Sequence, residues 1–213
     1  MKESKIYQIY LDLLQKYGSP EKYWPQWCKK LKTLRDREII ALGAILTQRT
    51  SWHNAETAIL NLKKTGLLSL KKISELQSSE RLIPYVRVAG FYQSKPRRLF
   101  DLCTFVVKNY GNIENLLKDE LKIIKEKLLS LYGIGPETAD TILLYSLDKP
   151  SFVIDEYTKR LAKKEELAEN FDYNCLENLF EKNLPADVKI YQDFHALIIF
   201  SQKEKNGWRM KTV

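Results

Sequence analysis

Residues 131–140 decide the fold, and they read Leu131-Tyr132-Gly133-Ile134-Gly135-Pro136-Glu137-Thr138-Ala139-Asp140. The two glycines allow two helices to meet through a very tight turn, because they adopt backbone conformations that a side chain would hinder. Pro136 suits the first turn of the second helix. The N–H groups of such a turn and helix start point outward together, and they can bind a phosphate without reading base sequence. An ordinary connection between two helices is the alternative.

A lone carboxylate follows this hairpin. Asp155 comes 155 − 135 = 20 residues after Gly135, directly behind the apolar Phe152-Val153-Ile154. Its place before a helical segment predicts an N-cap aspartate. A carboxylate beside a sugar can also stabilise the cation that forms when a glycosidic bond breaks, or it can orient a water for attack. Asp155 is therefore a candidate for either role.

Composition limits the class of protein. Across 213 residues, 35 Lys and Arg against 27 Asp and Glu give a net charge of +8 and a pI near 9.2. This excess favours a polyanionic partner such as nucleic acid, although many basic chains have none. The N-terminus has no apolar signal sequence, and no apolar run approaches a membrane span. We expect an intracellular protein that does not contact membranes, cytoplasmic and nucleoid-associated in a prokaryote.

Cysteine usage points away from a metal or a disulfide framework. Cys28, Cys103 and Cys175 are odd in number and far apart in the sequence. We therefore expect reduced thiols, no metal site and no cofactor.

Apolar residues recur at helical spacing almost throughout, which predicts an all-α protein. After a first helix ended by Gly18, the expected helices cover 38–46, 54–64, 70–77, 79–86, 94–109, 113–131, 136–147, 156–164, 173–183 and 188–203. No repeat or flexible linker divides the chain. We therefore expect one unit over 1–213, a monomer, with a central lobe of about 35–145 carrying the hairpin at 131–139. The second lobe would combine 1–34 with 146–213.

Two further segments make the pattern specific. They are Leu46-Thr47-Gln48-Arg49-Thr50 and Gly90-Phe91-Tyr92-Gln93-Ser94-Lys95. With the hairpin and Asp155, they resemble the helix-hairpin-helix DNA glycosylases of the endonuclease III superfamily over roughly residues 35–200. The resemblance implies a two-lobed all-α fold with a DNA-binding cleft between the lobes. It also implies that the partner is double-stranded DNA containing damaged bases.

The resemblance carries roles to individual positions. Asp155 would be the catalytic carboxylate, and Gly133, Gly135 and Thr138 would bind the DNA backbone through the hairpin. Gln48 would fill the gap left by a flipped base, while Phe91 would wedge beside the orphaned partner or simply be a core residue. Lys95, with Arg97 and Arg98, would contact phosphates from a helix start or form a solvated face.

Glu137 restricts the chemistry. Bifunctional members of the superfamily carry a lysine two residues after the second hairpin glycine, where it forms a Schiff base with the sugar. Here 135 + 2 = 137 is a glutamate, which cannot form an imine. We expect no lyase activity, unless Lys159, Lys163 or Lys164 lies in the cleft. Glu137 can equally be a first-turn residue favoured by the helix dipole.

The C-terminal region also departs from the superfamily. Many relatives end in four closely spaced cysteines that hold an iron–sulfur cluster, whereas this chain has no cysteine after Cys175. We therefore expect no such cluster.

Two tryptophans are candidates for the base pocket. Trp24 precedes Pro25, and Trp52 closely follows the Gln48 segment. With Glu137, this pattern is similar to the clusterless 3-methyladenine DNA glycosylases, which stack the alkylated base between two aromatic rings. A cationic base is attracted to such rings by about 0.5–2 kcal/mol each. Both tryptophans can alternatively be ordinary core or surface aromatics.

His195 marks a departure from that subfamily. Its members carry a lysine two residues after the matching histidine, where this chain has Leu197. His195 itself fits a satisfied core histidine better than a ligand.

The resulting expectation is a monofunctional enzyme of base excision repair. It would flip alkylated purines out of DNA, 3-methyladenine first, and hydrolyse the N-glycosidic bond. A uracil or thymine mismatch glycosylase is the first alternative. A non-catalytic hairpin module, with Asp155 only as a cap, is the second.

Overall fold

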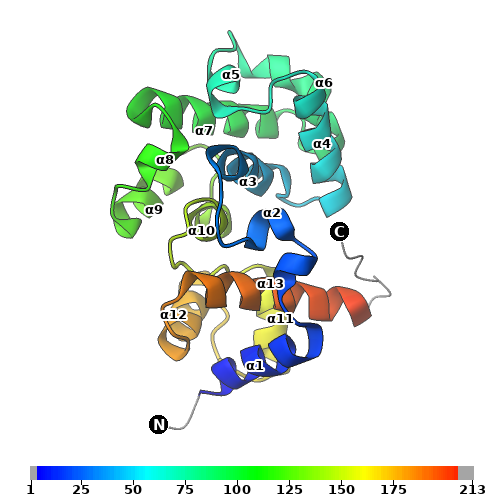
Figure 1. The fold of residues 1–213 in the computed structure, drawn as a ribbon, viewed down its shortest axis with the longest axis vertical. Coiled ribbons are helices and arrows are strands. Elements are labelled where there is room, and N and C mark those ends of the chain that lie inside the picture. Colours follow the sequence, from blue (N-terminus) through cyan, green and yellow to red (C-terminus); the bar gives the residue numbers. More distant parts are fainter. Residues whose placement is uncertain (1–3, 206–213) are drawn as a thin grey trace. The chain divides into compact units, whose positions relative to one another are not determined.

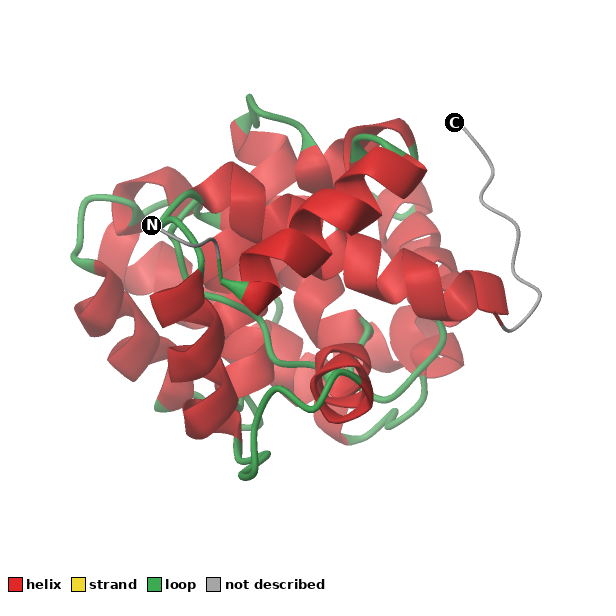
Figure 2. Cartoon of the chain, turned by 90° about the horizontal axis from the view of Figure 1, so that it is seen from below, coloured by secondary structure: helices red, strands yellow, loops and turns green. Residues whose placement is uncertain are grey.

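The computed structural model describes residues 4–205, and this part of the chain is built from helices without any β-strand (Figures 1 and 2). The all-α prediction is confirmed. No helix within 4–205 is long and apolar enough to cross a membrane. The chain forms two compact units. The terminal unit comprises Met1–Leu31 and Asp148–Val213, and the central unit comprises Lys32–Leu147.

The central unit is built around α3. Its helices are α3 (Leu34–Leu46), α4 (Trp52–Lys64), α5 (Leu70–Ser74), η2 (Ser79–Leu82), α6 (Ile83–Val86), η3 (Arg87–Ala89), α7 (Ser94–Tyr110), α8 (Ile113–Leu116), α9 (Leu121–Leu129), α10 (Pro136–Thr141) and η4 (Ile142–Ser146). Thr33 and Asp36 form a capping box that starts α3. Every residue from Ile40 to Leu46 is buried. Because this stretch is apolar on all sides, it belongs inside the unit.

The terminal unit packs around α13. Its helices are α1 (Lys5–Tyr17), η1 (Pro20–Lys22), α2 (Pro25–Cys28), α11 (Glu156–Lys164), α12 (Tyr173–Asn183) and α13 (Val188–Lys205). Both α1 and α11 contact α13 (Figure 1). Phe152 stacks on Phe180 at 4.7 Å and meets Phe194 edge-on at 5.8 Å, between ring centroids. This aromatic cluster anchors the segment that ends at Asp155.

Two expected helices are interrupted. The predicted helix 113–131 breaks between α8 and α9, where the Asp119 carboxylate accepts hydrogen bonds from Tyr110 Oη and Lys127 Nζ at 2.6 and 2.8 Å. The predicted helix 136–147 widens into a π-helical turn at η4, closed by Leu147 N donating to Ile142 O. There Ser146 exchanges two hydrogen bonds with Arg37 of α3. Tertiary contacts thus override the local helical pattern.

Candidate active site

The hairpin joins α9 to α10 in the central unit. Gly133 has φ = +72°, a left-handed conformation that favours glycine, whereas Gly135 is extended with φ = −94° and caps α10. Between them Ile134 is buried, and its N–H donates to Leu131 O at 3.2 Å. Ile134 therefore anchors a turn whose two glycines are exposed.

A second constraint favours glycine at position 133, in addition to the backbone conformation. A Cβ atom at this position would lie 2.2 Å from Arg98 Nε and 2.7 Å from Arg98 Cδ. Nothing lies within 4 Å of a Cβ added to Gly135. Gly133 is thus required by the packing of the unit itself, whereas Gly135 leaves open space beside the turn.

An ion pair holds the two hairpin helices together. Asp140 of α10 is fully buried, and its carboxylate accepts from Lys125 Nζ of α9 at 2.9 Å. Asp140 ends the hairpin stretch 131–140, but its pairing with Lys125, 15 residues earlier, cannot be read from the motif.

Glu137 lies on the surface in the first turn of α10. Its backbone carbonyl accepts a hydrogen bond from Thr141 Oγ1 at 2.7 Å. A carboxylate in this position complements the positive end of the helix dipole. Thr138, one residue further on, is buried and faces Gln48.

Gln48 is fastened to the hairpin. Its Nε2 donates to Gly133 O at 3.1 Å and to Thr138 Oγ1 at 2.8 Å, while its Oε1 accepts from Arg98 Nη1 at 2.6 Å. These contacts connect the turn after α3 with the hairpin and with α7. The next residue, Arg49, has φ = +48°, so the turn is tight.

The structure contradicts the predicted role of Lys95. The expected phosphate contact is wrong, because the side chain is fully buried and its Nζ donates to Leu46 O at 2.8 Å and Ala89 O at 2.7 Å. Burial and, to a smaller extent, the neighbouring Arg98 charge together lower the pKa of the Lys95 ammonium to about 8. Lys95 satisfies the carbonyl at the C-terminus of α3.

Phe91 is 50% exposed and has φ = +47°. The alternative that it is a core residue is therefore wrong. A large apolar ring held out from a tight turn is suited to contact with another molecule. Its predicted role as a wedge remains a prediction.

Asp155 caps α11 in the terminal unit. Its Oδ1 accepts from Thr158 N at 2.7 Å, and its Oδ2 lies 3.5 Å from His195 Nε2. Burial by itself would raise the pKa of the Asp155 carboxyl group. The His195 charge and hydrogen bond, together with Thr158, outweigh burial and hold the pKa below its ordinary value. A carboxylate kept ionised in a largely buried place can stabilise a nearby cation.

Lys203 and Trp24 lie in the same unit. Lys203 Nζ lies 5.9 Å from the centroid of the Trp24 ring and 6.0 Å from that of Tyr157. Burial lowers the pKa of the Lys203 ammonium, while the Asp155 charge acts in the opposite direction. Trp24 is half-buried and meets Phe200 edge-on at 4.9 Å. Sequence reasoning missed Lys203, although it follows His195 on α13 by about two turns.

Trp52 belongs to the central unit. It is half-buried at the first position of α4, directly after the N-cap Ser51. Trp24 and Trp52 thus come from different units. The expected stacking of a base between them remains a prediction.

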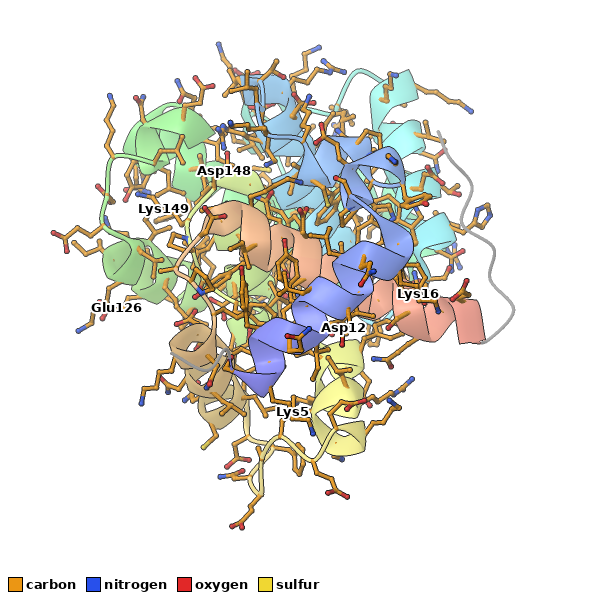
Figure 3. All side chains as sticks on the ribbon, turned by 60° about the horizontal axis from the view of Figure 1, so that its bottom comes forward. Lys5, Asp12, Lys16, Glu126, Asp148 and Lys149 are labelled. Atoms are coloured by element: carbon orange, nitrogen blue, oxygen red, sulfur yellow. The ribbon has the colours of Figure 1, made fainter. Side chains whose placement is uncertain are left out.

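A groove of about 600 Å³ lies elsewhere in the terminal unit, between α1, α11 and α13. Figure 3 labels Asp12 and Lys16, which belong to its α1 side. Its lining includes Leu13, Arg160 and Gln202 but neither Asp155 nor Trp24. We therefore do not assign it to the candidate site. No cluster of three metal-ligating side chains occurs among the described residues.

Comparison with known proteins identifies the family. Residues 42–186, more than half of the chain, match the HhH-GPD superfamily of base excision DNA repair proteins. The chain belongs to this superfamily. A relative from Methanocaldococcus jannaschii, MJ1434, is 44% identical over an alignment 205 residues long that covers 93% of this chain and 89% of the relative. Its name provisionally calls it a DNA repair glycosylase.

Solved structures agree with this assignment. The 3-methyladenine DNA glycosylase MagIII of H. pylori, bound to 1,N6-ethenoadenine, has a TM-score of 0.77 and 30% identity, covering 95% of this chain and 99% of that one. A non-covalent endonuclease III–DNA complex has a TM-score of 0.71 at 15% identity, covering 94% and 85%. The second likeness concerns the fold alone. This HhH-GPD protein is accordingly a DNA glycosylase of base excision repair.

Proposed function

We propose that this glycosylase excises alkylated purines, 3-methyladenine first, by hydrolysis and without nicking the DNA strand. The observation that carries the proposal is the Asp155 carboxylate, which stays ionised although it is largely buried. Breaking the N-glycosidic bond develops positive charge on the sugar, and an ionised carboxylate beside C1′ lowers that barrier. His195 and Thr158 hold the group in place as the cap of α11.

The substrate class is supported by chemistry as well as by similarity. An N3-methylated adenine is cationic, so it is an activated leaving group that needs no strong general acid. One carboxylate then suffices. The H. pylori relative, 30% identical over 95% of this chain, is a 3-methyladenine DNA glycosylase. A mismatch glycosylase acting on uracil or thymine needs hydrogen-bond donors aimed at a neutral base, whereas aromatic faces favour a cationic one.

The base pocket is proposed to use both tryptophans. Trp24 already attracts a cation, since the Lys203 ammonium lies over its ring. A cationic base would compete with Lys203 for that ring. Trp52 is proposed to supply the second aromatic face, with Gln48 filling the gap in the DNA and Phe91 wedging beside the orphaned base.

The absence of lyase chemistry is proposed from Glu137. The hairpin position that carries the Schiff-base lysine in bifunctional relatives is here an exposed carboxylate at the start of α10. The product would then be an intact strand with an abasic site. Gly133, Gly135 and the turn between them are proposed to hold the DNA backbone through main-chain N–H groups.

Base-release assays on four duplexes test the proposal. They contain 3-methyladenine, 1,N6-ethenoadenine, uracil or 8-oxoguanine, and the product is examined before and after alkaline cleavage. We expect release from the first duplex above all, with strand breaks only after alkali. Preferential release of uracil or 8-oxoguanine would contradict the substrate class. Strand breaks without alkali would contradict the hydrolytic mechanism.

A further inference from the structure

The side-chain carboxamide of Gln48 uses most of its hydrogen-bonding capacity on partners within the central unit. Both hydrogens of Nε2 are donated, to Gly133 O and Thr138 Oγ1, and Oε1 accepts from Arg98 Nη1. A side chain that is to enter DNA has to give up all three hydrogen bonds. Relative to a side chain inserted into DNA, this conformation would be a retracted one, held by the hairpin and Arg98.

Arg98 makes the strongest of these contacts. Its hydrogen bond to Gln48 is short, 2.6 Å, and a charged donor makes a hydrogen bond roughly twice as strong as a neutral one. The other two bonds join neutral groups. Loss of Arg98 should therefore loosen Gln48 more than loss of the Thr138 hydroxyl.

Arg98 is held in turn by the hairpin. Its side chain passes so close to Gly133 that an added Cβ would lie 2.2 Å from Nε. Nε itself is buried and has no hydrogen-bond partner among the described residues. The neighbouring Arg97 differs, because it is exposed and its guanidinium carbon lies 4.2 Å from the centroid of the Tyr132 ring, whereas that of Arg98 lies 6.0 Å away. Any movement of the turn at Gly133 therefore also moves Arg98.

We propose that Arg98 is a positioning residue that holds Gln48 retracted against the hairpin, and that contact of the hairpin with DNA releases Gln48 to fill the gap. The proposal rests on the proposed gap-filling role of Gln48. It makes insertion conditional on a seated hairpin, because Gly133 touches both Gln48 and Arg98. In the absence of DNA, the hairpin turn would therefore keep the Gln48 side chain in its retracted conformation.

The test follows Gln48 in real time. A duplex carrying a tetrahydrofuran abasic analogue beside 2-aminopurine is mixed with enzyme in a stopped-flow fluorimeter. The fluorescence phase that is lost in Gln48→Ala reports insertion. Arg98→Met keeps much of the side-chain stem under Gly133 but removes the donors. We expect this variant to accelerate the insertion phase by about tenfold, as loss of a hydrogen bond from a charged donor implies.

Three comparisons complete the design. Thr138→Val removes a neutral hydrogen bond at nearly constant volume, so it should accelerate insertion by a smaller factor. Arg97→Met removes the same charge one residue away and should weaken DNA binding without changing the insertion rate. Arg98→Lys, which keeps a charged donor, should fall between Arg98→Met and the wild type. Thermal unfolding of each variant identifies any that fail to fold.

Several results would overturn the proposal. An insertion phase that is slower or unchanged in Arg98→Met would show that Arg98 does not restrain Gln48. A fast fluorescence phase that is still present when Arg98→Met is combined with Gln48→Ala would show that this phase does not report the movement of Gln48. A full wild-type fluorescence signal in Gln48→Ala would show that Gln48 does not enter the DNA. Because the abasic analogue carries no base to excise, an error in the proposed substrate class leaves these outcomes unchanged.

Side-chain amide exchange gives a readout without DNA. In the free wild-type protein, the Nε2 hydrogens of Gln48 should exchange slowly with solvent, and Arg98→Met should speed their exchange while Arg97→Met leaves it unchanged. Fast exchange in the wild type would contradict the retracted state directly.

Discussion

The Asp155 carboxylate and the His195 imidazole face each other across 3.5 Å, from Oδ2 to Nε2, at the junction of α11 and α13. The contact couples the charge of the Asp155 carboxylate to the His195 side chain. His195 is buried, as a core histidine would be, yet it also keeps the pKa of a largely buried carboxyl group below its ordinary value.

Replacing the carboxylate is the most direct test of the mechanism. Asp155→Asn keeps the size and the capping oxygen of the side chain but removes its negative charge. We expect base release to fall by roughly 100-fold or more, the scale on which electrostatic transition-state groups act. Affinity for undamaged DNA should stay at the wild-type level. Full activity in single-turnover assays would exclude Asp155 from catalysis.

The pH profile tests the role of His195. The pKa of Asp155 is lower in the folded protein than in the unfolded chain, so its contribution to stability is present above about pH 4 and disappears as the pH falls through the folded pKa. In His195→Gln, burial is no longer opposed by the histidine charge. The acid limb of kcat/KM should then move to higher pH. An unchanged acid limb would mean that His195 does not set this pKa.

The two hairpin glycines should respond differently to the same substitution. Gly133→Ala places a side chain at φ = +72° and against Arg98, so the free energy of unfolding should fall by about 1–2 kcal/mol from the backbone conformation alone. Gly135→Ala meets open space and should leave stability unchanged. If the backbone there approaches a phosphate, Gly135→Ala should still weaken DNA binding. Urea unfolding and fluorescence anisotropy separate the two effects.

How far local sequence predicts the fold is clear from particular helices. The bounds of α11 and α12, 156–164 and 173–183, agree with the sequence prediction, because each helix follows an aspartate and has an apolar stripe of its own. The breaks at 117–120 and 142–146 escaped prediction. They depend on Asp119 and Ser146 reaching partners on other helices or in other turns.

In the candidate site, too, local motifs could be predicted from the sequence, whereas contacts between distant residues could not. Asp155, Gln48 and the two glycines could be proposed from the sequence because they belong to short motifs or lie at a fixed spacing from one. Lys95 was assigned wrongly, since a lysine at a helix start usually faces solvent. Nothing in the local sequence reveals that Leu46 O, 49 residues away, accepts a hydrogen bond from its Nζ. Arg98 and Lys203 stand out only through contacts with residues far away in the sequence, Gln48 and Trp24.

The tryptophans are distinguished by the charge of the substrate. Trp52→Ala should slow release of cationic 3-methyladenine by about two- to thirtyfold more than release of 1,N6-ethenoadenine, which is uncharged at neutral pH. Trp24→Ala should show a smaller difference, because Lys203 already lies over that ring. Release rates at saturating enzyme give the ratio. Equal losses on both lesions, matched by equal losses of DNA binding, would count against an aromatic sandwich.

Glu137 allows the missing activity to be introduced. Glu137→Lys places an amine at the position that forms the Schiff base in bifunctional relatives, on the exposed first turn of α10. We expect borohydride to trap this variant covalently on abasic DNA, whereas wild type and Glu137→Gln give no adduct. The Glu137→Gln control shows whether loss of the carboxylate is enough. A trapped wild-type adduct would instead mean that a different lysine forms the Schiff base. Lys203→Met would then test the half-buried Lys203 amine, whose pKa is lowered by burial.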